Sequence, residues 1–277
     1  ARIVVAVADP DARVNGRGLE KAKTAGIDTD LGVGSAAAKA VLSGFLTRIE
    51  RGRPYVSMKT AASLDGGIAL ADGEKRWLTG RPMRYFVHEV RSRCDALLTG
   101  VGTILADDPE LTCRAPARNA DSPAVFVLDS QLRTPPTARI FGAGRRPVTL
   151  LCKSSAPKDR LMALTQAGAV VTRLPAYPNG QLDLHAVLDY LGAGGINTLL
   201  VEAGTGVTTA MLAAELVDKI YWTQSPHILG ADARSVVGSL KLVALPNQNL
   251  YTQLTSSQLG QDQLRVFVQD INADHIG

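Results

Sequence analysis

The order of apolar and amphipathic segments is the feature that most constrains the fold of this chain. Short apolar runs alternate with helix-like segments over most of its length, whereas the last two strand-like runs, 219–224 and 263–269, have no helix between them. Alternating strands and helices favour a parallel sheet, and a pair of successive strands adds an antiparallel edge. We therefore predict an α/β fold in which helices flank one mixed sheet.

A boundary is expected at Arg51-Gly52-Arg53-Pro54, because Gly and Pro punctuate regular structure. Upstream of it the hydrophobic patterns predict a strand at 3–7 and helices at 19–25 and 33–49. Because these few elements form only a thin core, this segment is not expected to fold alone. We divide the chain into a first segment, 1–50, and a main domain, 51–277.

The main domain is predicted to open with a strand at 55–60 and a helix at 82–93, for which Thr79 is the expected N-cap. Further strands are expected at 95–99, 124–129, 146–152, 170–174 and 198–202, and further helices at 158–167, 184–191 and 207–216. Together with the two late strands, these elements are sufficient for one large sheet with helices on its faces.

The charge of the chain suits an anionic small ligand better than nucleic acid. The formal net charge is +4, but no run of Lys and Arg exceeds two residues and no aromatic stripe offers stacking for bases. The cysteines Cys94, Cys113 and Cys152 lie far apart and the four histidines are scattered, so neither a disulfide framework nor a zinc site is expected. Reduced thiols and strand-sized apolar runs predict a cytoplasmic protein without membrane spans.

Two strand–glycine–helix transitions, 97–103 and 200–206, share a G-x-G pattern. Glycine lets the backbone approach a ligand closely, and the free N–H groups at a helix start favour phosphate. Neither transition has the third glycine of the dinucleotide fingerprint, and each taken singly is more typical of a tight strand-to-helix turn than of a ligand site. Two such turns at the carboxyl ends of sheet strands nevertheless favour a nucleotide cleft.

Four charged side chains stand at positions that allow either a structural or a functional role. Glu202 follows a buried strand and either binds N–H groups of a ligand or pairs with a nearby cation. Arg91 and Arg114 bracket the Asp107-Asp108-Pro109 turn and either clamp a phosphate or remain solvated. Lys59 interrupts a largely apolar strand and either snorkels to the surface or points into a site.

Several motifs resemble one family closely and in the right order. They are Lys59-Thr60-Ala61-Ala62-Ser63-Leu64-Asp65-Gly66, Trp77-Leu78-Thr79, the run from Leu105 to Arg114, Val127-Leu128-Asp129-Ser130, Val201-Glu202-Ala203-Gly204 and His227-Ile228-Leu229-Gly230. The chain is similar to the bifunctional deaminase–reductase of riboflavin biosynthesis, and specifically to its reductase half. This resemblance implies a dihydrofolate-reductase-like fold. It also implies NADPH-dependent reduction of the ribosyl group of 5-amino-6-(5-phosphoribosylamino)uracil to a ribityl chain.

The resemblance also implies roles for individual residues. The residues expected to line NADPH are Ala61, Trp77, Thr103, Asp107 and Ser130, with Gly204, Thr205, Gly206, Val207, Thr208, Thr209 and Ala210 around its pyrophosphate. The residues expected to hold the phosphoribosylaminopyrimidine substrate are Arg91, Leu111, Arg114 and Glu202, together with Lys75, which stands where many members have Ser. The catalytic candidates are Lys59, Asp107 and Glu202, and the proton is expected from Lys59, Asp107 or solvent.

Residues 1–50 resemble the tail of the family's cytidine-deaminase-like domain. The His-x-Glu and Pro-Cys-x-x-Cys zinc ligands of such a domain are absent, so zinc is expected only if a further deaminase part lies upstream of residue 1. An exposed segment of this kind favours a homo-oligomer, a dimer or tetramer. Three alternatives stay open: a dihydrofolate-reductase-like enzyme with another pterin or pyrimidine substrate, a non-catalytic NADPH-binding scaffold, and a zinc deaminase.

Overall fold

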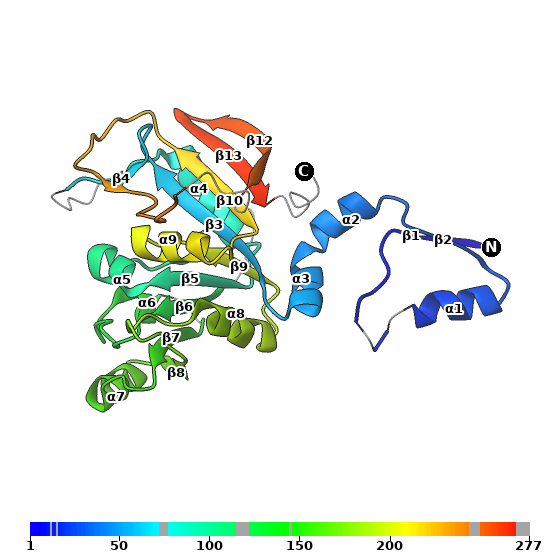
Figure 1. Cartoon of the computed structure of the whole chain (residues 1–277), viewed down its shortest axis with the longest axis horizontal. Coiled ribbons are helices and arrows are strands. Elements are labelled where there is room, and N and C mark those ends of the chain that lie inside the picture. The colour runs from blue at the N-terminus through cyan, green and yellow to red at the C-terminus, as the bar shows by residue number, and fades with distance from the viewer. Residues whose placement is uncertain are drawn as a thin grey trace. The chain divides into compact units, whose positions relative to one another are not determined.

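The structure is a computed structural model that describes residues 1–11, 13–14, 16–71, 77–114, 122–143, 146–243 and 250–269 (Figure 1). The chain forms two compact units. The smaller consists of residues 1–55 and 188–198, and the larger consists of residues 56–187 and 199–277. The larger unit carries every residue for which a catalytic or binding role is expected.

The smaller unit begins with two parallel strands joined through a helix. Strand β1 (Arg2–Val5) pairs with β2 (Asp28–Leu31), and α1 (Arg17–Thr24) lies between them in the chain. The predicted single helix over 33–49 is wrong, because two helices, α2 (Ser35–Val41) and α3 (Ser43–Arg51), occupy this stretch. A Ser-Gly pair is a common site of helix interruption, and a Cβ on Gly44 would lie only 2.6 Å from Cγ2 of Thr198.

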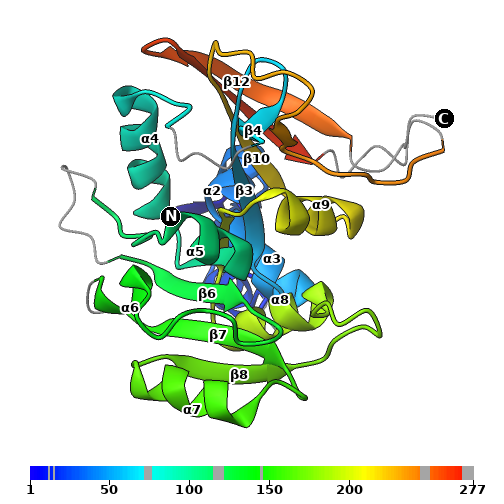
Figure 2. The same ribbon diagram turned by 90° about the vertical axis from the view of Figure 1, so that its left-hand side faces the viewer.

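A nine-stranded mixed sheet dominates the larger unit, which confirms the predicted α/β fold. Its strands run in the order β12-β13-β10-β3-β9-β5-β6-β7-β8. Their bounds are Tyr251–Leu259 for β12, Asp262–Gln269 for β13, Lys219–Gln224 for β10, Tyr55–Ala62 for β3, Thr198–Val201 for β9, Ala96–Gly100 for β5, Ala124–Leu128 for β6, Val148–Lys153 for β7 and Val170–Leu174 for β8. Figure 2 shows β8 at one end of this sheet and the β12–β13 hairpin at the other.

Parallel and antiparallel pairing divide the sheet as the sequence predicts. Strands β9, β5, β6, β7 and β8 pair in parallel, and β10 is parallel to β3. The last two strands, β12 and β13, form an antiparallel hairpin that joins the sheet through β10. A small separate ladder joins β4 (Gly67–Ala69) to β11 (Arg234–Ser235).

Helices pack on the sheet through one continuous apolar core. In register, Leu97 of β5 lies beside Leu200 of β9 and Val125 of β6, so these side chains share one face. Val90 and Ile104 join them from the helical side. The helices of this unit are α4 (Arg81–Arg91), α5 (Val101–Asp107), α6 (Arg139–Gly142), α7 (Lys158–Gln166), the first residues of α8 (Leu184–Ala193, assigned to the smaller unit from Leu188 on) and α9 (Thr205–Ala213).

The predicted N-cap of α4 is wrong. Gly80 occupies that position with no side-chain cap of its own, and the backbone oxygen of Thr79 instead accepts a hydrogen bond from Nη1 of Arg84. A residue 182 positions later in the chain takes this role, because the N–H of Gly80 donates to Oδ2 of the buried Asp262 at 2.7 Å. This contact fixes α4 against the turn of the β12–β13 hairpin.

Asp262→Ala should lower the free energy of unfolding by about 1–3 kcal/mol, because the partly buried N–H of Gly80 loses its charged acceptor. Urea titrations of the two proteins measure the difference. Asp262→Asn is the matched control, since its amide oxygen still accepts the bond and should retain most of the stability. Equal unfolding midpoints for wild type and Asp262→Ala would show that the contact does not position α4.

Candidate functional site

The two strand–glycine–helix transitions meet at one edge of the sheet. Leu98 of β5 lies in register with Val201 of β9, and the N–H of Glu202 donates to the oxygen of Leu98 at 3.0 Å. Gly100 is then the N-cap of α5, and Gly204 is the N-cap of α9. A Cβ on Gly100 would lie 2.8 Å from Cγ2 of Val207, so glycine is needed there for the first turns of both helices to touch.

The start of α9 offers free N–H groups to a ligand. Gly204 is its N-cap, no side chain caps it, and the first bond within the helix runs from the N–H of Thr208 to the oxygen of Gly204. The N–H groups at 205–207 therefore lack partners within the helix. A Cβ on Gly204 or Gly206 would meet no atom within 4 Å, so the space beside the Cα atoms of these two glycines is open. This arrangement suits a phosphate or pyrophosphate.

The threonines of α9 bind the loop that follows β10. Oγ1 of Thr205 donates to the oxygen of Ser235, and Oγ1 of Thr209 donates to the oxygen of Thr205 at 2.6 Å. The same Thr209 oxygen accepts the N–H of Gly238 at 2.7 Å. Their hydroxyl groups thus fix the loop, and the backbone remains the part of α9 that is free to bind an anion.

A buried ion pair lies two residues before Gly204. Arg91, the last residue of α4, donates from Nε to Oε1 of Glu202 at 2.5 Å and from Nη2 to Oε2 at 2.9 Å. Its Nη1 donates to the oxygen of Thr112 at 2.9 Å. The two charged side chains are only 12% and 11% exposed. Of the alternatives for Glu202, the pairing with a cation is therefore observed.

The pair keeps both groups charged despite their burial. Burial alone raises the pKa of Glu202, but the charge and hydrogen bonds of Arg91, with the charge of Lys59, hold that pKa below its usual range. Burial likewise lowers the pKa of Arg91, and Glu202 outweighs it and raises that pKa. Glu202 is therefore a carboxylate at neutral pH, available as a hydrogen-bond acceptor.

Lys59 faces this pair from β3. It lies in register with Tyr221 of β10, whose ring meets that of Phe86 on α4 edge-on at 5.8 Å, so Lys59 shares the face that α4 covers. Lys59 keeps some exposed surface, but burial lowers the pKa of its ammonium group. The charge of Glu202 raises this pKa, and the charge of Arg91 lowers it further. No carboxylate of the described residues forms an ion pair with it, and the ion-pair partner of Glu202 is Arg91.

His88 is a member of this cluster that the sequence did not single out. Its Nδ1 accepts the N–H of Arg114 at 3.2 Å, and its backbone oxygen accepts a hydrogen bond from the thiol of Cys113. Burial, then the charges of Arg91 and Arg114, lower the pKa of His88. The position of His88 one helical turn before Arg91 was the signal that could have identified it.

Arg114 and Leu111 lie on the loop that Arg91 contacts. Leu111 is buried with a φ of 50°, which is uncommon for a residue with a Cβ. Arg114 is exposed, and its Nη1 lies 3.4 Å from Oε2 of Glu110. The structure thus brings Arg91, Arg114 and Glu202 together through Thr112 and His88.

The other residues expected to bind the cofactor or the substrate differ in exposure and in their place on the fold. Ala61 is half-buried two residues after Lys59 on β3, Thr103 is in the first turn of α5, and Ser130 follows the end of β6. Trp77 is 78% exposed with the guanidinium carbon of Arg84 4.9 Å from its ring centre. Asp107 is exposed at the end of α5 and is not part of the buried charge cluster. Lys75 lies outside the described residues.

A buried carboxylate fixes the turn that carries Ser130. Asp129 accepts the N–H of Arg133, the N–H of Thr134 and the hydroxyl of Thr134, each at 2.8 Å. Asp129→Ala should therefore lower the free energy of unfolding by about 2–4 kcal/mol, because two buried donors of Thr134 and the partly buried N–H of Arg133 lose a charged acceptor. Chemical denaturation measures it, with Asp129→Asn expected at an intermediate value. A loss below about 0.5 kcal/mol for Asp129→Ala would contradict the assigned role.

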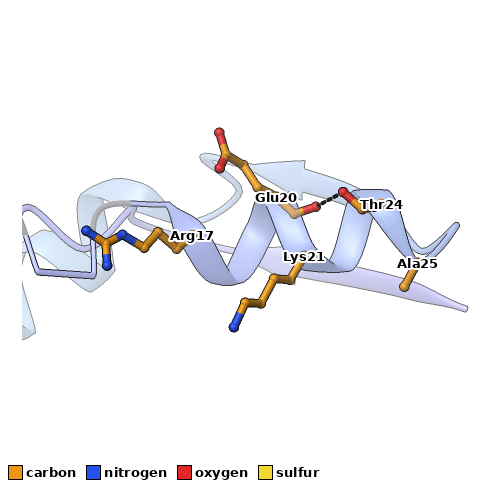
Figure 3. A pocket seen from close by; sticks show the side chains of 5 residues that line it. All are labelled: Arg17, Glu20, Lys21, Thr24 and Ala25. Carbon is orange, nitrogen blue, oxygen red and sulfur yellow. Dashed lines mark hydrogen bonds between the residues drawn. The ribbon is translucent and has the colours of Figure 1, made fainter.

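Two surface depressions include none of the residues of this cluster. One depression follows α1 and is lined by Arg17, Glu20, Lys21, Thr24 and Ala25 alone. Figure 3 shows the three long side chains pointing in different directions from a single helix, so no group converges on a ligand. A second, of about 350 Å³, lies between residues 132–136 and α7. Among the described residues no His, Cys, Asp and Glu group is placed to hold a metal, and no helix is long and apolar enough to cross a membrane.

Comparisons with known proteins identify the family of this chain. The model of the RibD C-terminal domain family matches residues 54–265. The riboflavin biosynthesis protein RibD of Escherichia coli is 36% identical over 253 residues, which cover 85% of this chain and 65% of that protein. The chain thus spans just under two thirds of this curated relative.

Two solved structures show the same fold. RibD of Acinetobacter baumannii has a TM-score of 0.83 at 30% identity, over 97% of this chain and 73% of that one. A diaminohydroxyphosphoribosylaminopyrimidine deaminase/5-amino-6-(5-phosphoribosylamino)uracil reductase of Thermotoga maritima has a TM-score of 0.82 at 26% identity, over 97% and 71%. The expected α/β fold with a mixed sheet is confirmed as the fold that these two proteins share. The chain belongs to the RibD C-terminal domain family and is homologous to the reductase portion of RibD.

Proposed function

We propose that this chain is an NADPH-dependent reductase that converts the ribosyl group of 5-amino-6-(5-phosphoribosylamino)uracil into a ribityl chain. One observation carries the proposal. A partly buried lysine, a buried carboxylate–arginine pair and an uncapped helix start lie together where β9 ends. Such a site can bind a dinucleotide at the helix start and an N–H-bearing ring at the carboxylate, and the lysine can supply a proton.

The residues at the sheet edge fit NADPH. The N–H groups of 205–207 and the open space at Gly204 and Gly206 suit its pyrophosphate, with Thr208, Thr209 and Ala210 in the turn behind them. Ala61, Trp77, Thr103, Asp107 and Ser130 would line the rest of the molecule. When bound, NADPH supplies the hydride that C1′ of the sugar receives.

Lys59 is the proton donor in this proposal. Reduction of the ring-opened imine of the substrate forms a C–H bond at C1′ and an N–H bond at the attached nitrogen, and the proton for that nitrogen comes from the ammonium group. Its lowered pKa favours release of the proton, and the nearby carboxylate of Glu202 favours its return. Asp107 is exposed at the far end of α5 and is less suited to this step.

Glu202 and the arginines would orient the substrate. Each carboxylate oxygen accepts one bond from Arg91 and has lone pairs left for N–H groups of the pyrimidine. Arg91 uses three of its five N–H groups on Glu202 and Thr112, so it retains two for a phosphate. Arg114, with Leu111 beneath it, supplies a second, exposed cation.

Substrate-dependent oxidation of NADPH by the purified chain tests the proposal. We expect turnover with the phosphoribosylaminopyrimidine, a much higher KM for the same substrate without its phosphate, and none with dihydrofolate. Equal turnover of dihydrofolate would indicate a different enzyme of this fold. NADPH binding without any turnover would indicate a scaffold, and either result would overturn the assignment.

A further inference from the structure

The loop 110–114 is held by side chains rather than by a backbone ladder. No backbone–backbone hydrogen bond to this loop occurs among the described residues. Its carbonyl groups accept instead from guanidinium groups of two distant elements. Arg91, at the end of α4, binds the oxygen of Thr112, and Arg146, just before β7, binds the oxygens of Glu110 and Leu111.

We infer that Arg146 is a positioning residue for the phosphorylated substrate, acting through the 110–114 loop. Its two Nη groups each donate to one of two consecutive carbonyl oxygens, which is a geometry that the planar guanidinium fork allows and a lysine does not. The inference rests on the proposed function, in which Leu111 and Arg114 of this loop hold the substrate.

The environment of Arg146 favours this role over a surface ion pair. In the described part of the chain no carboxylate pairs with it, and its Nε is buried without an acceptor. Burial, then the charge of Arg91, lowers the pKa of Arg146 to about 10. Partial desolvation of a guanidinium group that binds only carbonyl oxygens costs free energy. The two hydrogen bonds that fix the loop geometry offset this cost.

The strain of the loop shows what Arg146 holds in place. Leu111 has a left-handed backbone, at a φ of 50°, although it carries a large buried side chain. Both peptide groups next to its Cα have their carbonyl oxygens fixed by Arg146. Release of these bonds would let Leu111 relax, and Arg114, three residues later, would move with it.

Steady-state kinetics of Arg146→Met and Arg146→Lys test the inference. Both variants should raise KM for the phosphorylated substrate about 10–100-fold, since small misplacements of a binding loop have effects of this size. KM for NADPH should stay within about twofold, because no hydrogen bond joins α9 to the loop in the described part of the chain. Arg160→Gln, which removes an exposed arginine bound to one carbonyl oxygen on another loop, is the matched control and should leave both constants unchanged.

The outcomes separate the possible failures. Recovery of the wild-type KM by Arg146→Lys would show that charge alone matters and would overturn the positioning role, as would an unchanged KM in Arg146→Met. An inactive wild-type protein would contradict the proposed function instead. If Arg146→Met does not fold, hydrogen exchange of residues 108–114 in folded Arg146→Lys decides: faster exchange confined to that loop is expected, and wild-type protection would overturn the inference.

Discussion

Lys59→Met should lower kcat by about 10²–10⁴-fold, which is the usual contribution of a positioned proton donor. The ammonium group lies on the buried face of β3, next to the Arg91–Glu202 pair, and has no carboxylate partner among the described residues. Methionine has similar length but no proton to give, so binding of NADPH should change little. Stopped-flow measurement of the hydride-transfer step with saturating NADPH gives the rate directly.

The matched control is Lys59→Arg, which keeps the charge at this position but does not release a proton at any pH of interest. It should be as slow as Lys59→Met. The pH profile adds a second check. Because burial lowers the pKa of Lys59, wild-type kcat should fall with rising pH at a lower pH than an ordinary lysine would dictate, and this limb should be absent in both variants. A Lys59→Met protein with more than about a tenth of the wild-type kcat would exclude Lys59 as the donor.

Glu202→Gln should lower kcat/KM by at least about 100-fold and destabilise the protein by about 3–5 kcal/mol. The substitution leaves Arg91 charged and 12% exposed without its carboxylate. It also removes the acceptor proposed for the pyrimidine. Urea unfolding and substrate-dependent NADPH oxidation measure the two effects on the same preparation.

The double variant Arg91→Met with Glu202→Leu separates stability from function. A buried ion pair replaced as a whole by apolar side chains is often tolerated, so this variant should regain most of the stability lost by Glu202→Gln. It should stay inactive, because the acceptor for the substrate is gone. Restored activity in the double variant would show that Glu202 acts on stability alone.

Acid should weaken the same pair. The pKa of Glu202 is depressed in the folded protein, so its contribution is fully present above the pKa of an unfolded glutamate, near about 4.3, and is lost as the pH falls through the lower folded value. Wild type should therefore lose stability on acidification more steeply than the double variant. Equal pH dependence of the two proteins would contradict the charged state assigned to the pair.

Much of the sheet was predictable because buried strands are locally apolar. Strands β5, β6, β7 and β9 read as apolar runs, and the glycines after β5 and β9 marked the edge at which the two helices begin. Strand β12 was missed because it lacks such an apolar run. Its residues from 252 to 258 are exposed and mostly polar, so it forms through pairing with β13 and not through a hydrophobic pattern.

The contacts that build the site were not predictable because they join residues far apart in the chain. Arg91 and Glu202 are 111 residues apart, and the sequence left open whether each would bind a ligand or a partner. The N–H of Gly80, the N-cap of α4, is bound by Asp262, 182 residues away, although Thr79 is a residue type that often caps helices. Neighbouring charge along the sequence could not show that Arg146 and Arg91 hold one loop between them.

A crystal structure of the chain with NADPH and ribose 5-phosphate is the most direct test of the central claim. We predict the pyrophosphate on the N–H groups of 205–207, the sugar phosphate beside Arg114, and C1′ of the sugar facing Nζ of Lys59. A cofactor or sugar phosphate bound on another surface, away from the Arg91–Glu202 pair, would contradict the proposed reaction.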